Sequence, residues 1–400
     1  MRNWLLGTSM LVMAGIPSDI AWASGNEISI EGSALLLGRA GAGRSTDDSA
    51  ATIAFYNPAG MSALQGMNAS TGLSYFDMNG SASMKTNIGG SESGVNYLPH
   101  AVAAISAATM ALNDKLTVGF AIGPTFGLTV DYQPTFPSAI FTDFTRSVSL
   151  ALQPVASYRL LPWLSIGVGP SIELSHLETK SQTPFGAINR LYDWNAAAGA
   201  VVGLELTPTP MTTIGVVYRS QVDHDFTGSR TGVEPSPSSL TLSQPPLVDL
   251  GLRQTVLPGV RVYADATWYG WSIFNQTVFN EPRVGTTILP RNWQDGATFA
   301  LGADYDLTPI VTVRAGVAYS TNIIPNEDRF PDAPFDQQYR YSVGATYHWS
   351  PDMSIDLGYE YADLGHNRVD ISAATTGGVS AYGSLQGDGN VVALQVNMAL

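Results

Sequence analysis

The sequence is poor in charge and lacks cysteine altogether. Only 13% of its 400 residues are Asp, Glu, Lys or Arg, against about 25% in an ordinary soluble domain. The absence of cysteine excludes disulfide scaffolds, thiolate nucleophiles and cysteine-ligated metals. The 19 basic residues are outnumbered by 33 acidic ones, the formal net charge is -14, and the basic residues form no run. This balance argues against a nucleic-acid partner.

Long hydrophobic runs are also missing. The run 4–16 has 13 residues, whereas a membrane-spanning helix needs about 20. Because Arg2 precedes this run and the small residues Ala21 and Ala23 follow it, it predicts a signal peptide over residues 1–23, cleaved near Ala23. A membrane anchor or a buried helix is the alternative. The rest of the chain could lie in a membrane only as a closed barrel, which satisfies every peptide group in lipid.

Apolar residues alternate with small or polar residues along the second half of the chain. The pattern is clear over 311–320, 339–349 and 354–361. Such period-two alternation predicts strands with one apolar face. The expected strands have about 11 to 16 residues, which is longer than a typical sandwich strand and long enough for a tilted membrane strand.

Turn signals divide the chain into hairpins. Short turns occur at Asn113-Asp114, Leu161-Pro162, Pro208 to Pro210, Leu257-Pro258, Thr308-Pro309 and Ser350-Pro351. They alternate with longer polar connections, as in outer-membrane barrels with short periplasmic turns and long extracellular loops. The spacing predicts an all-β fold, a transmembrane antiparallel β-barrel of about 14 strands over residues 67–400. Two of the expected strands are 211–227 and 259–278.

The piece before the first strand, residues 24–66, does not alternate and is rich in Gly and Ala. Side chains fill only barrels of about eight strands, so a wider barrel would leak if its lumen were empty. We therefore expect residues 24–66 to form an N-terminal hatch, a plug inside the lumen.

Several motifs together resemble a known family. They are Leu-Gly-Arg-Ala at 37–40, Asp-Asp-Ser-Ala at 47–50, Phe-Tyr-Asn-Pro-Ala-Gly at 55–60, and segments 218–225, 267–272, 293–305, 314–316 and 343–347. In order and spacing they resemble the FadL-type outer-membrane transporters of long-chain fatty acids and other hydrophobic compounds. The resemblance implies a fourteen-stranded barrel with a hatch, ligand capture among extracellular loops, a lumen pocket, and lateral release through a kinked strand. Short loops, and Leu400 in place of a terminal aromatic residue, depart from the family pattern.

Gly123 and Pro124 interrupt the third expected strand, 115–127. Proline lacks the donor for a ladder hydrogen bond and is tolerated in a sheet only at an edge or a bulge. The pair is therefore a candidate for the lateral opening that the resemblance implies, or for a simple bulge at the rim.

An apolar loop follows this strand. Its large apolar residues are Phe136, Ile140, Phe141 and Phe144. Exposed apolar patches often mark binding surfaces, so these four are candidates for ligand capture. Packing of the loop on itself is the alternative.

Within the hatch, Asn57, Pro58 and Ala59 predict a turn followed by the start of a helix, and we expect their role to be structural. Nearby apolar residues are candidates to line a pocket or, alternatively, to form the hatch core. They are Leu35, Leu36, Leu37, Phe55 and Tyr56.

The alternation of side chains along the expected strands places a set of charged residues on the lumen face. The basic ones are Arg219, Arg261, Arg314 and Arg340, and the acidic ones are Asp223, Asp265, Asp304, Asp356 and Glu360. We expect a solvated network that anchors the hatch. One arginine pairing with a ligand carboxylate is the sharper hypothesis.

The chain offers little for catalysis. Its five histidines show no metal-ligand spacing, and it has no nucleophile elbow or phosphate loop. We expect no enzyme activity, no metal and no cofactor. Together with the resemblance, which implies the cargo, the sequence predicts a passive, monomeric transporter of the bacterial outer membrane for long-chain fatty acids or similar hydrophobic molecules. Its expected partners are such a ligand, a fatty acid or a hydrocarbon, and membrane lipid. The alternatives are a channel for aromatic hydrocarbons or other xenobiotics, a lipid-acting enzyme using His348 with a serine, and a structural barrel or adhesin.

Overall fold

The computed structural model describes residues 32–400 except 183–187, 231–235, 282–284, 335 and 374–377. The expected signal peptide, 1–23, and the first residues of the expected hatch lie outside the described residues. Within the described part, no helix has the length and apolar character needed to cross a membrane.

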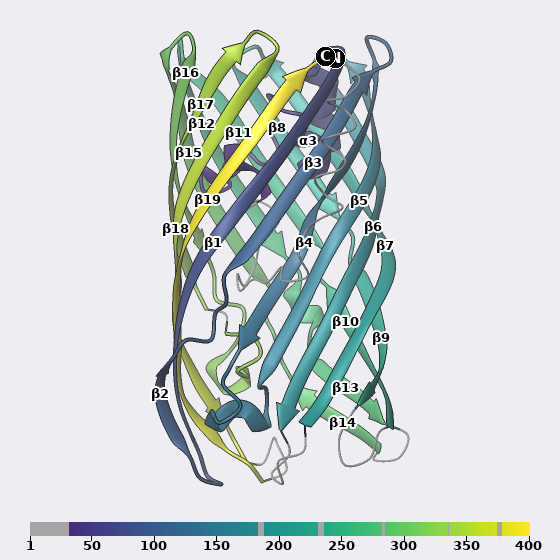
Figure 1. Cartoon of the computed structure of the whole chain (residues 1–400). Helices are drawn as coiled ribbons and strands as arrows, with labels where there is room; N and C mark the ends of the chain where they lie inside the picture. Colours follow the sequence, from purple (N-terminus) through teal and green to yellow (C-terminus); the bar gives the residue numbers. More distant parts are fainter. Residues whose placement is uncertain (1–31, 183–187, 231–235, 282–284, 335, 374–377) are drawn as a thin grey trace.

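Fourteen of the described strands form one closed antiparallel barrel (Figure 1). They are β1 (Met67–Thr86), β3 (Ala101–Ala111), β4 (Leu116–Asp131), β5 (Phe144–Leu161), β6 (Leu164–Gln182), β7 (Ile188–Thr209), β8 (Thr212–Arg219), β11 (Leu247–Leu257), β12 (Val260–Tyr269), β15 (Gly296–Thr308), β16 (Val311–Ser320), β17 (Gln338–Ser350), β18 (Met353–Ile371) and β19 (Ala381–Ala399). The first strand, β1, pairs with β19 as well as with β3, and this pairing closes the sheet. Closure leaves the barrel without a free edge.

The two faces of the wall differ as the alternation predicts. On the outer face, Leu301, Val317 and Val343 are about half exposed, as apolar side chains that meet lipid should be. On the inner face of β16, Thr312 and Arg314 are buried. The predicted all-β barrel of about 14 strands is thus confirmed, and its short turns fall at the six expected places.

Two strands end earlier than expected, because the chain leaves the barrel wall at the end with the long connections. The strand expected over 211–227 stops with β8 at Arg219, and that expected over 259–278 stops with β12 at Tyr269. Beyond these points a second sheet, in the order β14-β13-β10-β9, extends the molecule. Its strands are β9 (Val222–Arg230), β10 (Ser236–Gln244), β13 (Gln276–Glu281) and β14 (Gly285–Pro290).

Loops fold over the lumen at the same end. These loops, which we call the cap, carry the short helices η4 (Pro137–Ile140), η5 (Trp271–Ile273) and η6 (Asn326–Asp328). The strand β2 (Ser91–Val95) does not belong to the cap, because it pairs with the end of β1 and lies at the outer side of the barrel. The rings of Tyr97, Tyr132 and Phe136 stack in a row, with successive centroids 5.3 Å apart. The buried Arg329 guanidinium donates to the carbonyl oxygens of Ile324 and Arg368, each at 2.8 Å. These contacts give the cap an apolar core and hold its loops together.

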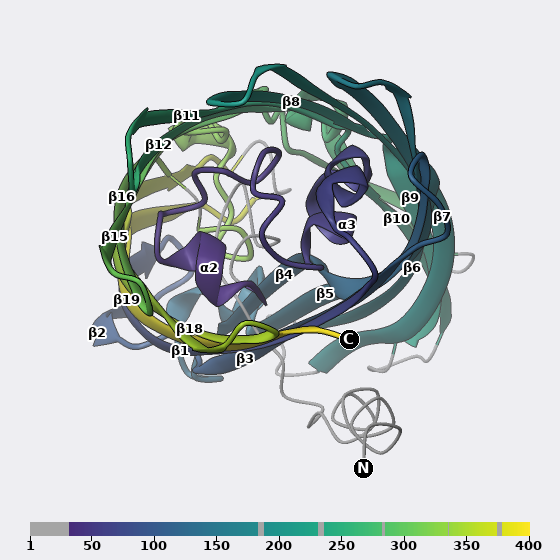
Figure 2. The same ribbon diagram turned by 90° about the horizontal axis from the view of Figure 1, so that it is seen from above.

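The hatch lies inside the half of the barrel that is nearer to the short turns, and Figure 2 shows it crossing the lumen. It contains α2 (Ala34–Leu37), α3 (Ile53–Tyr56) and η3 (Pro58–Ala63), and most of its residues are buried. The predicted plug is therefore present in the lumen.

Glycines in the wall allow the hatch backbone to approach closely. They form directly opposed pairs on neighbouring strands: Gly167 with Gly203, Gly215 with Gly251, Gly302 with Gly316, and Gly344 with Gly358. A β-carbon at Gly316 would lie 2.2 Å from the Arg39 carbonyl oxygen, and one at Gly215 would lie 2.1 Å from that of Ser45. No side chain fits at such distances, so this glycine belt, defined by the four pairs, is a condition for seating the hatch.

Candidate functional site

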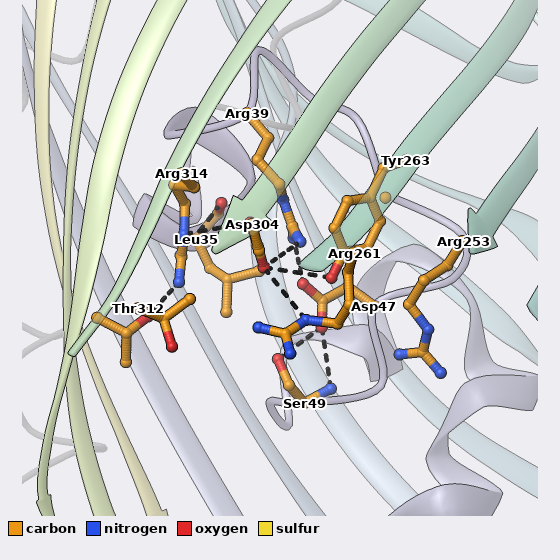
Figure 3. A network of polar contacts seen from close by, with 12 residues as sticks. Leu35, Arg39, Asp47, Ser49, Arg253, Arg261, Tyr263, Asp304, Thr312 and Arg314 are labelled. Atoms are coloured by element: carbon orange, nitrogen blue, oxygen red, sulfur yellow. Dashed lines mark hydrogen bonds and ion pairs between the residues drawn. The ribbon is translucent and has the colours of Figure 1, made fainter. Parts of the chain in front are cut away.

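A buried ion-pair network joins the hatch to the wall (Figure 3). Arg39 of the hatch, which is fully buried, pairs with Asp47 of the hatch and lies 3.2 Å from the Asp304 carboxylate of β15. Its guanidinium also stacks over the ring of Tyr263, 4.0 Å from the centroid. One hatch arginine thus links two parts of the hatch to two wall strands.

Wall residues extend this network. Arg261 forms a two-pronged ion pair with Asp306, with distances of 2.9 and 2.6 Å. The Arg314 guanidinium lies 3.7 Å from the Asp304 carboxylate and 3.4 Å from that of Asp356. Of the charged residues expected on the lumen face, the structure therefore gathers Arg261, Asp304, Arg314 and Asp356 beside the hatch.

The other expected members lie elsewhere on the lumen face. Asp265 accepts a hydrogen bond of 2.6 Å from the backbone N–H of Gly43, and Arg219 donates to the Phe55 carbonyl oxygen. Both therefore hold the hatch at separate points. The remaining buried members are Arg340 and Glu360.

Asp223 does not face the lumen. It is exposed on β9, because the strand expected over 211–227 breaks after Arg219 and the alternation resumes one residue out of step. His224 points inward instead and is buried. The prediction of an inward Asp223 is wrong, since parity counted along a sequence cannot be carried across an unrecognised break.

The charge on Asp47 persists in acid. Burial alone would raise the pKa of this carboxyl group, but the Arg39 charge and the hydrogen bonds from Ser49 hold it well below its usual range. A lowered pKa contributes stability that is present above the ordinary value of 3.8 and is lost as the pH falls towards the lowered one. Lowering the pH from 7 to 4 should therefore leave this contribution intact. Ionic conductance of the pore in planar bilayers should stay constant over that range, and a rise already near pH 5 would contradict the assignment.

Asn57 ties the NPA segment, Asn57 to Ala59, to the wall. Its amide nitrogen donates to the carbonyl oxygens of Ser45 and Leu204, at 2.7 and 3.1 Å, and its side-chain oxygen accepts from the Ala59 N–H at 3.1 Å. Pro58 occupies the first position of η3, where its missing donor costs nothing. All three contacts of Asn57 are within the hatch or to β7.

An apolar cavity occupies the lumen at the end with the long loops. It encloses about 770 Å³, counting its open mouth. Its apolar lining includes Phe126, Leu128, Leu177, Leu240, Trp271 and Trp293. Hydroxyl groups of Ser147, Ser149 and Ser175 line the side formed by β5 and β6. An apolar pocket with a few polar groups is the usual form of a small-molecule site.

The cavity adjoins the kink in β4. Pairing between β3 and β4 ends at Ile122, directly before Gly123 and Pro124, and the pairing of β4 with β5 shifts register immediately after Pro124. Phe126, on the far side of this bulge, lines the cavity. The wall therefore lacks a ladder between β3 and β4 beside the cavity.

Two parts of the hatch cover this gap from inside. A β-carbon at Gly123 would lie 3.2 Å from the Phe55 ring and 3.1 Å from Ile105 of β3. A β-carbon at Gly32 would lie 3.1 Å from Ile105 and 3.6 Å from Pro124. The hatch therefore packs against the inner face of the unpaired stretch.

Glu173 of β6 connects the cavity to the kink. Its carboxylate accepts from the Thr125 hydroxyl at 3.2 Å, and Thr125 is the bulged residue of β4. The same carboxylate lies 3.5 Å from Nε2 of His224, which lines the cavity. Both side chains are almost fully buried.

A second lumen cavity, on the side of the short turns, has a charged lining. It lies beside the hatch, reaches the turn at Thr308-Pro309 and has a volume of about 1010 Å³ when open solvent is counted. Its charged lining includes Asp47, Arg253, Arg261, Asp304, Asp306 and Arg314. An apolar molecule moving straight along the barrel axis would have to displace the solvation of these charges.

The structure separates the candidate pocket-lining residues from the apolar cavity. Leu35, Leu36, Phe55 and Tyr56 pack with wall residues in one buried cluster, and Leu37 packs in another. None of the five is among the described residues that line the apolar cavity. Leu35, Leu36, Phe55 and Tyr56 pack in the core of the hatch, the alternative that the sequence left open, and Leu35 also lines the second, charged cavity.

The candidate capture residues are also spread apart. Phe136 is buried under the cap, and Phe141 packs against Phe330 with ring centroids 6.2 Å apart. Ile140 and Phe144 are partly exposed, and Lys180 lies over the Phe144 ring at 4.5 Å. Their part in ligand capture stays a prediction.

The sequence did not identify the residues that define the buried ion-pair network and the apolar cavity. Arg39 and Asp47 stand in the sequence only as parts of motifs, although charges of both signs in a segment expected inside the lumen are a signal for buried ion pairs. Trp271 and Trp293 lie in motifs too, but nothing local in the sequence brings them together at a centroid distance of 5.0 Å.

Comparisons with known proteins give a consistent result. Residues 14–400 match the family described as "Outer membrane protein transport protein (OMPP1/FadL/TodX)". Outer membrane protein P1 of Haemophilus influenzae is 28% identical over 89% of this chain and 89% of its own. A long-chain fatty acid transport protein of Salmonella typhi is 23% identical over 88% of this chain and 91% of its own.

Solved structures share the fold. A FadL homologue of Pseudomonas aeruginosa superposes with a TM-score of 0.87 at 21% identity, covering 94% of this chain and 99% of that one. The toluene transporter TodX of Pseudomonas putida gives a TM-score of 0.69 at 17% identity, covering 93% and 99%. At these identities the likeness concerns the architecture of the barrel and not its ligand.

Proposed function

The chain belongs to the family of outer membrane transport proteins that includes FadL and TodX, and from this premise we propose that it moves hydrophobic molecules passively, through the lumen cavity and sideways out between β3 and β4. Its coarse function follows from the family. The chain is an outer-membrane protein that transports hydrophobic compounds, and it is a transporter, not an enzyme. The hypothesis of a lipid-acting enzyme using His348 is set aside accordingly.

The positions of the apolar cavity and of the charged cavity in the lumen support the lateral route. The apolar cavity ends at the kink of β4, where β3 and β4 are unpaired, whereas the cavity towards the short turns is lined by charges. A hydrophobic molecule therefore meets less resistance sideways, towards lipid, than along the axis. The apolar cavity also argues against a purely structural barrel or adhesin.

In the proposed sequence of events, the protein acts as a monomer in outer-membrane lipid. A hydrophobic molecule is captured at the cap, where Ile140 and Phe141 remain partly exposed. It enters the apolar cavity and leaves through the gap when the hatch segment carrying Phe55 moves away from Gly123. No step requires a cofactor or an energy source.

Locking the gap should abolish transport. A β-carbon at position 123 would lie 3.1 Å from Ile105 Cγ1, so a disulfide between Ile105→Cys and Gly123→Cys is within reach. We expect uptake of labelled oleate by cells lacking their own transporter to fall to background under oxidising conditions and to recover on reduction. The chain has no other cysteine, so the bond forms at one place.

The matched control lies in the intact ladder of the same two strands. Ala108 and Phe120 are directly paired, and a disulfide between cysteines at these positions should leave uptake unchanged. If the pair at 105 and 123 is fully oxidised and uptake continues at the rate of the reduced protein, the lateral route is wrong.

Two cargo classes fit an apolar cavity, and a competition assay separates them. Long-chain fatty acids are the first candidate, and aromatic hydrocarbons are the second because tryptophan and phenylalanine rings line the cavity. In the cells described above, uptake of labelled oleate that resists excess toluene would favour fatty acids. Uptake of toluene that resists excess oleate would favour the second class.

A further inference from the structure

The charges that line the apolar cavity are already matched to one another. Among the described residues of the lining, Arg291 is the only lysine or arginine, and Asp332 is the only acid. The Arg291 guanidinium donates to both carboxylate oxygens of Asp332, at 2.7 and 2.6 Å. Two parallel bonds of this kind use the full donor edge of the guanidinium.

The rest of the Arg291 side chain is engaged as well. Its Nε donates to the Thr277 hydroxyl at 2.9 Å, and the guanidinium carbon lies 4.8 Å from the centroid of the Phe330 ring. The residue is only 5% exposed. The charge of Arg291 is therefore already paired, and its three named hydrogen bonds use the N–H groups that face Asp332 and Thr277.

His224 offers no unmatched positive charge either. The Asn195 amide nitrogen donates to the Asp225 carbonyl oxygen at 2.8 Å, so the Asn195 oxygen faces His224 Nδ1, 3.1 Å away, and that nitrogen carries the hydrogen. Nε2 lies 3.5 Å from the Glu173 carboxylate. The other ring nitrogen of His224 therefore faces a carboxylate that belongs to the protein.

From this charge matching we infer that the cavity takes its ligand in an uncharged form, as a neutral amphipathic molecule. The inference rests on the proposed function. The apolar body would lie against Phe126, Trp271 and Trp293, and a hydroxyl, ester or protonated acid would face the serines of β5 and β6. Among the lining residues that the structure describes, a carboxylate anion would find no unpaired cation, and it would lie near Asp332 and Glu173, so it would have to be bound without compensation.

The test compares two alkyl probes that differ only in their head group. Terminally brominated undecanol and undecanoate are titrated into the full protein in lipid nanodiscs at pH 8, where an ordinary carboxyl group is ionised. Bromine quenches nearby tryptophan, and Trp271→Phe identifies the part of the signal that comes from the cavity. We expect the alcohol to bind at least about tenfold more tightly than the carboxylate, which corresponds to about 1.4 kcal/mol.

Removing the carboxylate partner of Arg291 should abolish this preference for the alcohol. Asp332→Asn removes the partner of Arg291, and it should strengthen undecanoate binding at least about tenfold with little change for undecanol. Arg291→Met combined with Asp332→Asn should restore the preference for the alcohol. Asp223→Asn, which neutralises an exposed acid outside the lumen, is the control and should change neither affinity.

The outcomes separate the two proposals. Equal binding of both probes by the unmodified protein, or an unchanged ratio in Asp332→Asn, would overturn the neutral-ligand inference alone. If neither probe quenches the cavity tryptophans, the cavity is not the ligand site, and the proposed route through it fails together with the inference. Retention of heat-modifiable gel mobility confirms that each variant is a folded barrel.

Discussion

Replacing Gly316 by leucine (Gly316→Leu) is expected to push the hatch off the wall and to open the lumen to ions. A β-carbon at this position would lie 2.2 Å from the Arg39 carbonyl oxygen and 2.6 Å from Arg39 Cα. These are backbone atoms, so no change of rotamer relieves the overlap. Because a barrel of fourteen strands is too wide for its own side chains to fill, conductance in planar bilayers should rise at least about tenfold.

The neighbouring residue provides the control. Ala315 lies on the same strand but faces outwards and is exposed, so Ala315→Leu adds a similar side chain on the lipid side. Its conductance should equal that of the unmodified protein. Closed pores in Gly316→Leu, in a protein that still migrates as a folded barrel, would show that the hatch does not need the glycine belt.

Replacing Arg39 by methionine (Arg39→Met) should loosen the hatch almost as severely. The change leaves the carboxylates of Asp47 and Asp304 buried without their shared partner. Removing one side of a buried ion pair typically costs about 3 to 5 kcal/mol. Hatch opening should therefore become more frequent by on the order of a hundredfold or more.

The rate at which a buried cysteine reacts with a maleimide measures this opening. Because the chain contains no cysteine, Ala54→Cys, in the fully buried part of α3, is a unique reporter. Arg368→Met removes an arginine whose partner, Asp370, is as exposed as itself, and such a surface pair contributes little. Equal labelling rates in the Arg39→Met and Arg368→Met backgrounds would show that the buried network does not hold the hatch.

The parts of the fold that follow a local rule were predictable from the sequence. Alternation placed Val317 outside and Arg314 inside, because a strand turns successive side chains to opposite faces whatever its neighbours are. Short turns containing proline or Asn-Asp set the hairpins for a similarly local reason. The placement of Asp223 failed at the break after Arg219, where the local rule itself stops.

The functional details depend on contacts between distant segments. Arg39 and Asp304 are 265 positions apart in sequence, and their pairing requires both the hatch path and the closure of the barrel. The apolar cavity requires more, because Phe126, Leu240 and Trp271 come from β4, the second sheet and η5. No periodicity relates such segments, so their meeting cannot be read along the chain.

The sequence alone was enough to establish a charge-poor, cysteine-free barrel with a plug, since hydrophobic period, turn chemistry and strand count act locally and add up along the chain. Folding in three dimensions decided which charges neutralise each other, where apolar space remains, and that this space ends at an unpaired stretch of wall. Those features follow from register, from one bulge and from the seating of the hatch on glycines. Each of these is a relation between segments, and it exists only once the barrel has closed.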